Sequence, residues 1–456
     1  SMVPGKDTSL TFENLRFYST KNVFSFAAAS VGSTLTLKNC DVESNGYYCV
    51  FIDVQGITLN IEGGNYVSNW GCVICGSTMP KTEAERTKIA VNINGAVLTQ
   101  TANVYGMFAP VSNGNGKSNM EINISDSTLN ANLTGKEDNG ACVKIGGNVE
   151  EYNLTADNVL TVKNSTLNSN VKFGIYVERT TKTDITIEDS TLNLNSTKTE
   201  GACIKAGGGN GTVENVTLTV KGNKTQINSK AWYCVSYQGA LNSAINLEGG
   251  KLTVEDLGQV ALAVSTSKTP ENARAKVTVS GAEIVTSKLA LDLDANTDFS
   301  ITAGKLNEDK STLSFGGKKQ TAQGNPFTNQ LYAQYLKGTT AESASTNVRF
   351  AVQVPMEGYE RYGFLVSIGN RVLLVGLANG EKILSVETAT LYTSVYANGE
   401  KIGTDAEGFG WLALGIDGIP QADFGTEFSV RPYAVKDGTV FLGGTYSFTV
   451  TELLSK

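Results

Sequence analysis

Apolar and polar residues alternate in short runs along the first two thirds of the chain, and the runs recur in one frame. Each copy holds two apolar residues separated by one polar residue, then an Asn, Asp or Gly two positions later, and another apolar residue three positions after that. Alternation with a period of two predicts short β-strands rather than helices. Eleven copies have first apolar positions spaced by 22 to 38 residues: Leu10, Leu35, Leu59, Val91, Ile122, Leu160, Ile185, Leu218, Ile245, Val277 and Phe299.

Two columns of the repeat predict geometry directly. The bend column holds only residue types that tolerate a left-handed backbone, so each copy is expected to turn at the same place. Its members are Asn14, Asn39, Gly63, Gly95, Asp126, Asn164, Asp189, Gly222, Gly249 and Gly281. Several copies close on an Asn, and we expect these amides to stack in a hydrogen-bonded ladder. The closing residues are Asn45, Asn69, Asn132, Asn170, Asn195 and Asn228.

A third alternating run follows each closing residue. GACVKIGG at 140–147 and GACIKAGG at 201–208 are two of these runs, with FGIYVE at 173–178 between them, and YGMFAP at 105–110 is another. The cysteine of this run is replaced by Gly or Ala in other copies, which indicates that small size, not thiol chemistry, is required there. Adjacent cysteines, such as Cys49 and Cys72, are also within reach of a disulfide.

Three short strands per turn and a variable loop after the third describe a stack of turns. About residues 8–317 resemble the pectate-lyase-like superfamily of right-handed parallel β-helices, on the strength of the Asn, Gly and Asp bends and the closing Asn residues. The resemblance implies an all-β fold of about eleven turns in a domain spanning 1–317. It says little about activity, because folds of this kind host lyases, hydrolases and non-catalytic surface proteins.

The pattern changes after the repeat. Residues 318–346 are expected to hold a capping helix, opened by Asn325-Pro326 as N-cap and first turn, and a linker. Residues 347–456 show strand-like runs, including YSFTVTEL at 446–453, separated by Asn-Gly and Asp-Gly turns. They predict an immunoglobulin- or fibronectin-like β-sandwich, similar to C-terminal modules of surface proteins of Gram-positive gut bacteria. That resemblance implies a secreted or cell-surface location.

Composition removes several functions. The 456 residues include no histidine, which excludes Ser-His-Asp and Cys-His triads and histidine-ligated metals. A net charge of −7 argues against binding to nucleic acid. The longest apolar runs are too short to predict a membrane span. Ser1-Met2 looks like a cleavage scar, and we expect the chain to belong to a longer multidomain protein.

The outward positions of the third run are the candidate ligand-binding residues. Lys144 and Lys205 should lie two turns apart with Tyr176 between them, an arrangement suited to an anionic sugar or a sulfate. Phe51 and Phe108 belong to the same outward row. No metal or cofactor site is predicted, since Cys72 and Cys75 form a lone C-x-x-C. The carboxylates are scattered, and Asp292 with Asp294 comes closest to a catalytic pair.

These features predict a non-catalytic extracellular surface protein that acts as an adhesin or glycan-binding rod. Its expected partner is a glycan or another component of a host or bacterial surface. The alternative is a polysaccharide-active enzyme, either a lyase or a glycoside hydrolase, or a catalytically dead relative of one. A purely structural spacer is a third interpretation. Clustered carboxylates on adjacent turns would favour the enzyme.

Overall fold

The structure is a computed structural model of the chain. It divides into two compact units, Ser1–Lys276 and Val277–Lys456. The residues that it describes are 1–76, 87–103, 109–113, 119–135, 140–146, 157–178, 182–196, 198–207, 213–255, 260–265, 275–286, 289–293, 297–301, 304–308, 311–315, 332–335, 338–355, 357–359, 361–368, 371–376, 390–392, 396–397, 400–401, 407–436, 439–442 and 446–455.

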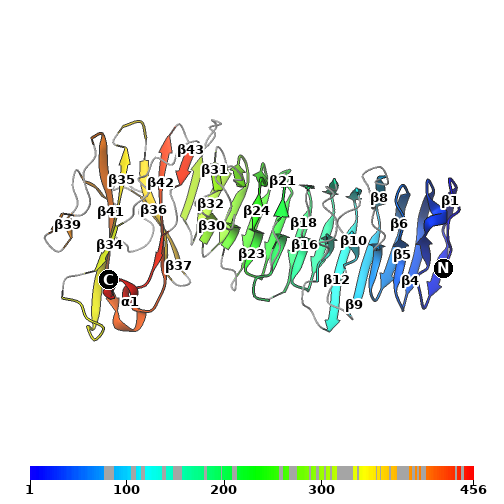
Figure 1. Cartoon of the computed structure of the whole chain (residues 1–456), viewed down its shortest axis with the longest axis horizontal. Helices are drawn as coiled ribbons and strands as arrows, with labels where there is room; N and C mark the ends of the chain where they lie inside the picture. The colour runs from blue at the N-terminus through cyan, green and yellow to red at the C-terminus, as the bar shows by residue number, and fades with distance from the viewer. Residues whose placement is uncertain are drawn as a thin grey trace. The chain divides into compact units, whose positions relative to one another are not determined.

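The first unit is a parallel β-helix, in which each turn contributes its strands to the same sheets (Figure 1). The first strands of successive turns pair in parallel so that Leu10, Leu35, Leu59, Val91, Ile122, Leu160, Ile185, Leu218 and Ile245 form one column. This column is the one predicted from the repeat, and it is confirmed through Ile245. The first strands are β1 (Ser9–Glu13), β4 (Thr34–Ser44), β6 (Thr58–Ser68), β8 (Ile89–Asn94), β11 (Met120–Ser125), β14 (Asn158–Lys163), β17 (Thr183–Glu188), β21 (Val216–Lys221) and β25 (Ala244–Leu247).

A left-handed residue separates the first strand of a turn from the second. Asn14, Asn39, Asp126, Asn164 and Asp189 all have φ between 46° and 57°, and Gly63, Gly95 and Gly222 are also positive, as predicted. In the turn of Gly249 the positive φ belongs to its neighbour Gly250. The second strands are β2 (Arg16–Ser19), the ends of β4 and β6, β9 (Val97–Asn103), β12 (Thr128–Gly135), β15 (Thr166–Ser169), β18 (Thr191–Leu194), β22 (Gln226–Ser229) and β26 (Lys251–Val254).

The third strands form a separate parallel sheet. Its register differs from the prediction in one turn, where the strand is Val111–Asn113 rather than 105–110. Val111 pairs with Val73 and Val143 on either side. The strand begins after Pro110 because proline has no N–H for the ladder. The third strands are β3 (Phe24–Phe26), β5 (Tyr48–Ile52), β7 (Gly71–Cys75), β10 (Val111–Asn113), β13 (Val143–Ile145), β16 (Phe173–Val177), β19 (Ala202–Ala206), β23 (Tyr233–Gln238) and β27 (Val260–Ser265).

The core of the β-helix is filled by the inward residues of all three strands. Leu35, Leu59, Val50 and Val143 are completely buried. Because strands in parallel sheets are spaced by about 4.8 Å, each inward side chain packs directly on its equivalents in the turns before and after it. Short elements complete the unit: the 3₁₀ turn Ala28–Ser30 and the parallel pair β20 (Val213–Glu214) and β24 (Ala240–Leu241).

The second unit begins with further strands of the repeat and ends as a sandwich. β29 (Glu283–Thr286) pairs in parallel with β32 (Gly304–Glu308), which pairs in antiparallel fashion with β33 (Ser311–Phe315). The other strands before residue 332 are β28 (Ala275–Val279), β30 (Leu289–Leu293) and β31 (Thr297–Ile301).

The sandwich consists of two antiparallel sheets with a common core, as predicted for this region. Phe350 and Leu412 of one sheet and Phe364 and Val430 of the other belong to a single buried cluster. The first sheet holds β34 (Tyr332–Tyr335), β35 (Ser345–Pro355), β41 (Phe409–Pro420) and β38 (Thr390–Tyr392). The second holds β36 (Arg361–Ile368), β37 (Arg371–Gly376), β42 (Phe428–Lys436), β43 (Thr439–Leu442) and β44 (Tyr446–Phe448). A small hairpin, β39 (Tyr396–Ala397) with β40 (Glu400–Lys401), and the 3₁₀ turn Gln421–Asp423 complete it.

Two expectations for this unit were wrong. The capping helix opened by Asn325-Pro326 was expected to carry Tyr332 and Tyr335 on its apolar face, but Tyr332–Tyr335 is a strand paired with β35. Residues 316–331 lie outside the described part of the chain. The strand expected over 446–453 ends at Phe448, and Val450–Leu454 is the helix α1. Thr449 accepts a hydrogen bond from the N–H of Glu452, whose carboxylate accepts one from the N–H of Thr449. The sequence T-x-x-E at 449–452 is the pattern that predicts this capping box.

Candidate functional site

The predicted ladder of closing Asn residues exists in parts. The Asn170 side-chain amide donates to the Asn132 Oδ1 atom at 3.2 Å, and the Asn69 amide donates to the Asn45 backbone carbonyl at 2.8 Å. Asn195 follows in the same column, with its N–H bonded to the Ser169 carbonyl. Asn228 was misplaced, because it pairs with Asn193 and so belongs to a column two residues earlier.

That earlier column carries the longest amide ladder. Asn168 donates to Asn130, Asn193 to Asn168, and Asn228 to Asn193, each with a nitrogen–oxygen distance of 3.0 Å. A second ladder joins Asn123 to Asn92 at 3.1 Å and Asn92 to Asn60 at 2.9 Å. The sequence signal for the first was the Asn of T-L-N at 128–130, 166–168 and 191–193, followed by the Asn of Q-I-N at 226–228.

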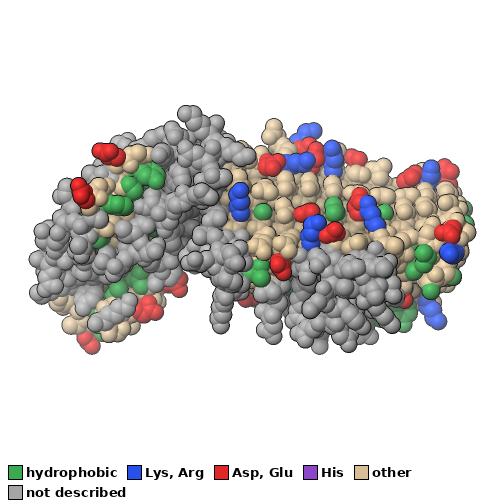
Figure 2. All heavy atoms as spheres, turned by 45° about the horizontal axis from the view of Figure 1, so that its top comes forward, with side chains coloured by type: hydrophobic (Ala, Val, Ile, Leu, Met, Phe, Trp, Pro, Cys, Tyr) green, Lys and Arg blue, Asp and Glu red, His purple; other side chains and the backbone are tan. Residues whose placement is uncertain are grey.

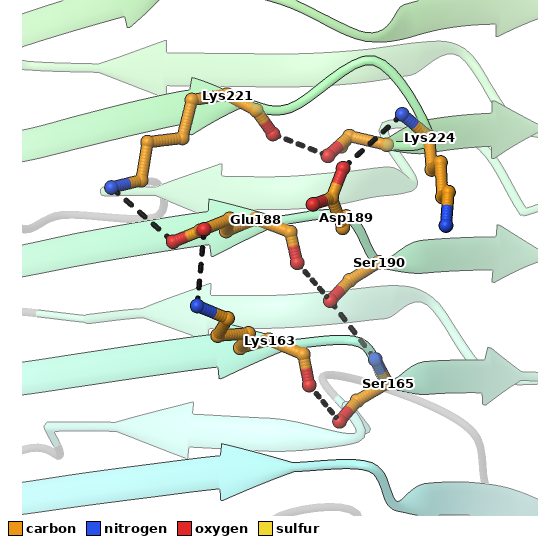
Figure 3. A network of polar contacts seen from close by, with 8 residues as sticks. Lys163, Ser165, Glu188, Asp189, Ser190, Lys221 and Lys224 are labelled. Atoms are coloured by element: carbon orange, nitrogen blue, oxygen red, sulfur yellow. Dashed lines mark hydrogen bonds and ion pairs between the residues drawn. The ribbon is translucent and has the colours of Figure 1, made fainter.

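Charged side chains form a column at the end of the first strands. Glu188 lies between Lys163, at 3.2 Å, and Lys221, at 3.3 Å, and Figure 3 shows this arrangement. Hydrogen bonds from Lys163 and then Lys221 lower the pKa of Glu188. At the bends beside it, the N–H of Ser165 donates to the Ser190 hydroxyl. On the face of this unit that Figure 2 shows, Lys, Arg, Asp and Glu side chains are interspersed.

The candidate row on the third strands has the predicted register but not the predicted exposure. Lys144 pairs with Tyr176, and Tyr176 with Lys205. All three residues are buried, with exposed fractions of 3%, 4% and 3% in that order, so they do not form an open sheet surface. Phe51, in the same row, is half-buried and stacks on Tyr48 with centroids 5.4 Å apart. Phe108 lies outside the described residues.

The two buried lysines have different partners. The Lys144 ammonium lies 3.2 Å from the Glu178 carboxylate and 5.5 Å from the centre of the Tyr176 ring. The Lys205 ammonium donates to the Ser236 hydroxyl at 3.0 Å, and within the described part of the chain it forms no ion pair. Burial, with a smaller effect of Lys172, lowers the pKa of Lys205 to about 8, against an opposing effect of Glu200. Lys144, Tyr176 and Lys205 are therefore buried side chains with polar partners and not an open binding surface.

Replacing each lysine by methionine should have opposite effects on stability. Lys205→Met removes a buried charge that has no carboxylate partner among the described residues, and it should raise the free energy of unfolding by about 2 kcal/mol at pH 7. Lys144→Met leaves Glu178 without its ion-pair partner, and it should lower the free energy of unfolding by about 2 kcal/mol. Chemical denaturation of both variants checks this. A loss of stability in Lys205→Met would contradict the assignment.

The Lys205 effect should also depend on pH. The pKa of this lysine is about 8 in the folded protein and lies below the value of about 10.4 for an unfolded lysine. Between about pH 8 and about pH 10.4 the unfolded chain binds more protons than the folded protein does. The stability of the parent protein therefore rises with pH in this range, relative to that of Lys205→Met. The difference between the two proteins should shrink from pH 8 to pH 10, and an unchanged difference would show that Lys205 is not desolvated.

The cysteines are free and buried, and the disulfide between Cys49 and Cys72 is not formed. Two of the thiols contact backbone carbonyls of the next turn: Cys142 lies 3.1 Å from the Asn168 carbonyl, and Cys203 lies 3.2 Å from that of Asn228. Burial raises the pKa of Cys142 and Cys203 to about 12. A thiol protonated at neutral pH is not a nucleophile, and these cysteines serve packing.

Other candidate sites gain no support from geometry. Among the described residues, no three His, Cys, Asp or Glu side chains gather as a metal site requires. Asp292 lies on β30, and Asp294 lies outside the described residues. The described helices include none that is long and apolar enough to cross a membrane.

Comparison with known proteins adds one similarity. The sequence matches no protein-family profile and no curated relative. Among solved structures, the chain is similar to the enzymatically active domain of tailspike protein 2 of bacteriophage CBA120, with 9% sequence identity and a TM-score of 0.27 over 97% of this chain and 72% of the other. The fold assignment rests on the strand registers described above.

Proposed function

We propose that this chain is a non-catalytic glycan-binding protein, an adhesin displayed at the surface of a Gram-positive bacterium. The β-helix provides a stiff support on which polar groups recur at every turn. Stacked amides such as those of Asn130, Asn168 and Asn193 present the same hydrogen-bonding chemistry about every 4.8 Å. A repetitive surface suits a repetitive polymer, because each additional contact is made at high effective concentration.

The observation that carries the non-catalytic part is the pairing of three surface carboxylates with lysines. Glu188 is held by Lys163 and Lys221, Glu62 by Lys38 and Glu121 by Lys88. Hydrogen bonds from Lys88 and Asn123 lower the pKa of Glu121, as those from lysines lower that of Glu188. A general acid in glycoside hydrolysis requires a raised pKa. These carboxylates therefore suit stacking of the turns rather than proton transfer.

The test is a panel of soluble polysaccharides assayed for binding and for turnover. Binding is measured by affinity electrophoresis, and turnover by the release of reducing ends and by absorbance of unsaturated uronides. We expect retardation by at least one polysaccharide without products after prolonged incubation. Product formation would replace the proposal by the polysaccharide-active alternative, and the absence of binding throughout the panel would remove it.

A further inference from the structure

Four aromatic residues are in ring contact where the second strand meets the third in the first turns of the β-helix, and Tyr18 lies in the preceding turn, hydrogen-bonded to Asn45. We call Tyr18, Tyr47, Tyr48, Phe51 and Trp70 the aromatic corner. Tyr48 pairs with Gly71 on the next turn, and Tyr47 and Trp70 are the residues directly before them. Tyr47 and Trp70 therefore lie on adjacent turns. Their ring centroids are 4.6 Å apart and the rings are nearly perpendicular, at 81°. Tyr48 joins the group, 6.1 Å from Trp70 and 5.4 Å from Phe51.

The aromatic corner is partly open to solvent. Tyr18 is 59% exposed and Tyr47 is 41% exposed, and Tyr48, Phe51 and Trp70 are half-buried. The exposed rings of Tyr18 and Tyr47 gain little from burial, so packing alone does not account for these two residues.

The turn itself does not require aromatic residues. In later turns, the residue that precedes the third strand is Lys172, before Phe173, and Gly201, before Ala202. These two positions are equivalent to those of Tyr47 and Trp70. The bend therefore forms with a lysine or a glycine there. In the turn after that of Gly201 the equivalent position, before Tyr233, holds Trp232, which is half-buried.

Hydrogen-bonding groups border the rings. The Asn45 side-chain amide donates to the Tyr18 hydroxyl at 3.1 Å, and the Asn69 amide donates to the Asn45 carbonyl at 2.8 Å. On the neighbouring strands Arg16 lies 3.6 Å from Glu43, the register partner of Tyr18. The corner thus combines apolar ring faces with neutral amides and hydroxyls.

We propose that the aromatic corner is a binding subsite for neutral pyranose sugars of a glycan chain. One face of a pyranose ring carries C–H groups that pack on an aromatic face, and its rim of hydroxyls bonds to amides and phenols. The nearly perpendicular Tyr47 and Trp70 rings offer a face and an adjoining edge to one sugar. Tyr18 and Asn45 provide the hydroxyl and amide at its border. This assignment rests on the proposed glycan-binding function and locates it.

The experiment compares Trp70→Ala and Tyr47→Ala with Trp232→Ala, a change at the equivalent corner of a later turn. The probes are neutral laminarin, dextran and yeast mannan, with polygalacturonate and heparin as anionic polysaccharides. We expect the parent protein to bind a neutral probe, Trp70→Ala and Tyr47→Ala to weaken that binding by roughly ten-fold or more, and Trp232→Ala to leave it unchanged. Far-ultraviolet circular dichroism and the unfolding temperature establish that the variants are folded.

The outcomes separate the two proposals. If a neutral polysaccharide binds equally well to the folded Trp70→Ala and Tyr47→Ala variants, the aromatic corner is not the subsite and the glycan-binding function remains. If the parent protein binds only the anionic probes, the assignment to neutral sugars fails. If it binds none of the five, both proposals fail. Should either variant not fold, Trp70→Phe and Tyr47→Ser replace it, with the same expected loss for Tyr47→Ser and a smaller loss for Trp70→Phe.

Discussion

Gly64→Ala is expected to lower the free energy of unfolding by about 4 kcal/mol or more. Gly64 has φ +86° and is the register partner of Cys40 in the previous turn. A Cβ atom at Gly64 would lie 2.0 Å from the Cys40 carbonyl oxygen and 2.7 Å from its nitrogen. Both contacts are with backbone, which cannot swing aside as a side chain would. Relief of the clash requires β4 and β6 to separate, and that breaks the ladder between two turns.

Gly95→Ala is the matched control for Gly64→Ala. Gly95 also has a positive φ, +67°, but a Cβ there would have its nearest neighbour, the Gly63 nitrogen, at 4.0 Å. Its substitution should cost only the left-handed strain of an alanine, about 1–2 kcal/mol. Chemical denaturation monitored by circular dichroism measures both. Equal losses would mean that the turns of Cys40 and Gly64 do not stack at the distance described.

Asn168→Asp should lower the free energy of unfolding by about 3 kcal/mol at pH 7. Asn168 donates to Asn130 and accepts from Asn193, so a carboxylate keeps the second bond but places an oxygen against the Asn130 Oδ1 atom. Repulsion disfavours the charged form and raises the pKa of the new carboxyl group above its unfolded value of about 3.9. The unfolded chain then loses its proton first, and the penalty grows as the pH rises through this range.

The pH dependence distinguishes a ladder from a simple loss of one contact. Below pH 4 the protonated carboxyl group introduced by Asn168→Asp can donate to Asn130, and most of the lost stability should return. Asn170→Asp is the control, because Asn170 donates to Asn132 in the same way but both residues are exposed to water. It should cost less than about 1 kcal/mol. If the two substitutions cost the same, or the loss in Asn168→Asp is independent of pH, the half-buried ladder is refuted.

The stacking of the turns could be predicted from the sequence because it depends on local rules. The period-two alternation and the left-handed bends at Asn14, Asn39 and Asn164 each follow from residue type, and together they set the register. The misassigned third strand shows the limit of this reasoning. The runs 105–110 and Val111–Asn113 are both short, and only the pairing of Val111 with Val73 and Val143 selects between them.

The candidate site was harder to predict. Alternation predicts that Lys144, Tyr176 and Lys205 share one side of their strands, and the register confirms that they form one column. It cannot say whether anything covers that side, and these side chains are buried. In the same way, Asn228 was aligned by letter with Asn195, although its hydrogen bond goes to Asn193. Depth and partner depend on tertiary packing, which a periodic pattern does not encode.

The aromatic corner was missed because its members belong to different parts of the repeat. Phe51 was identified from the outward row, but Tyr47 and Trp70 lie in the turns that precede two third strands. Turn residues carry no alternation, so their proximity emerges only when the register of adjacent turns is known. Exposed aromatic residues at equivalent turn positions are the signal by which such a site could be found.

The formation of a disulfide across two adjacent turns tests the central claim most directly. Asn132 and Asn170 are exposed and share a hydrogen bond, and Asn195 is one turn further on. Backbone positions one turn apart lie at about 4.8 Å, within reach of a disulfide, and those two turns apart lie beyond it. After mild oxidation, Asn132→Cys/Asn170→Cys should lose both accessible thiols to an intramolecular bond, and Asn132→Cys/Asn195→Cys should keep both. Failure of the first pair to close, or closure of the second, would contradict the stacking of the turns.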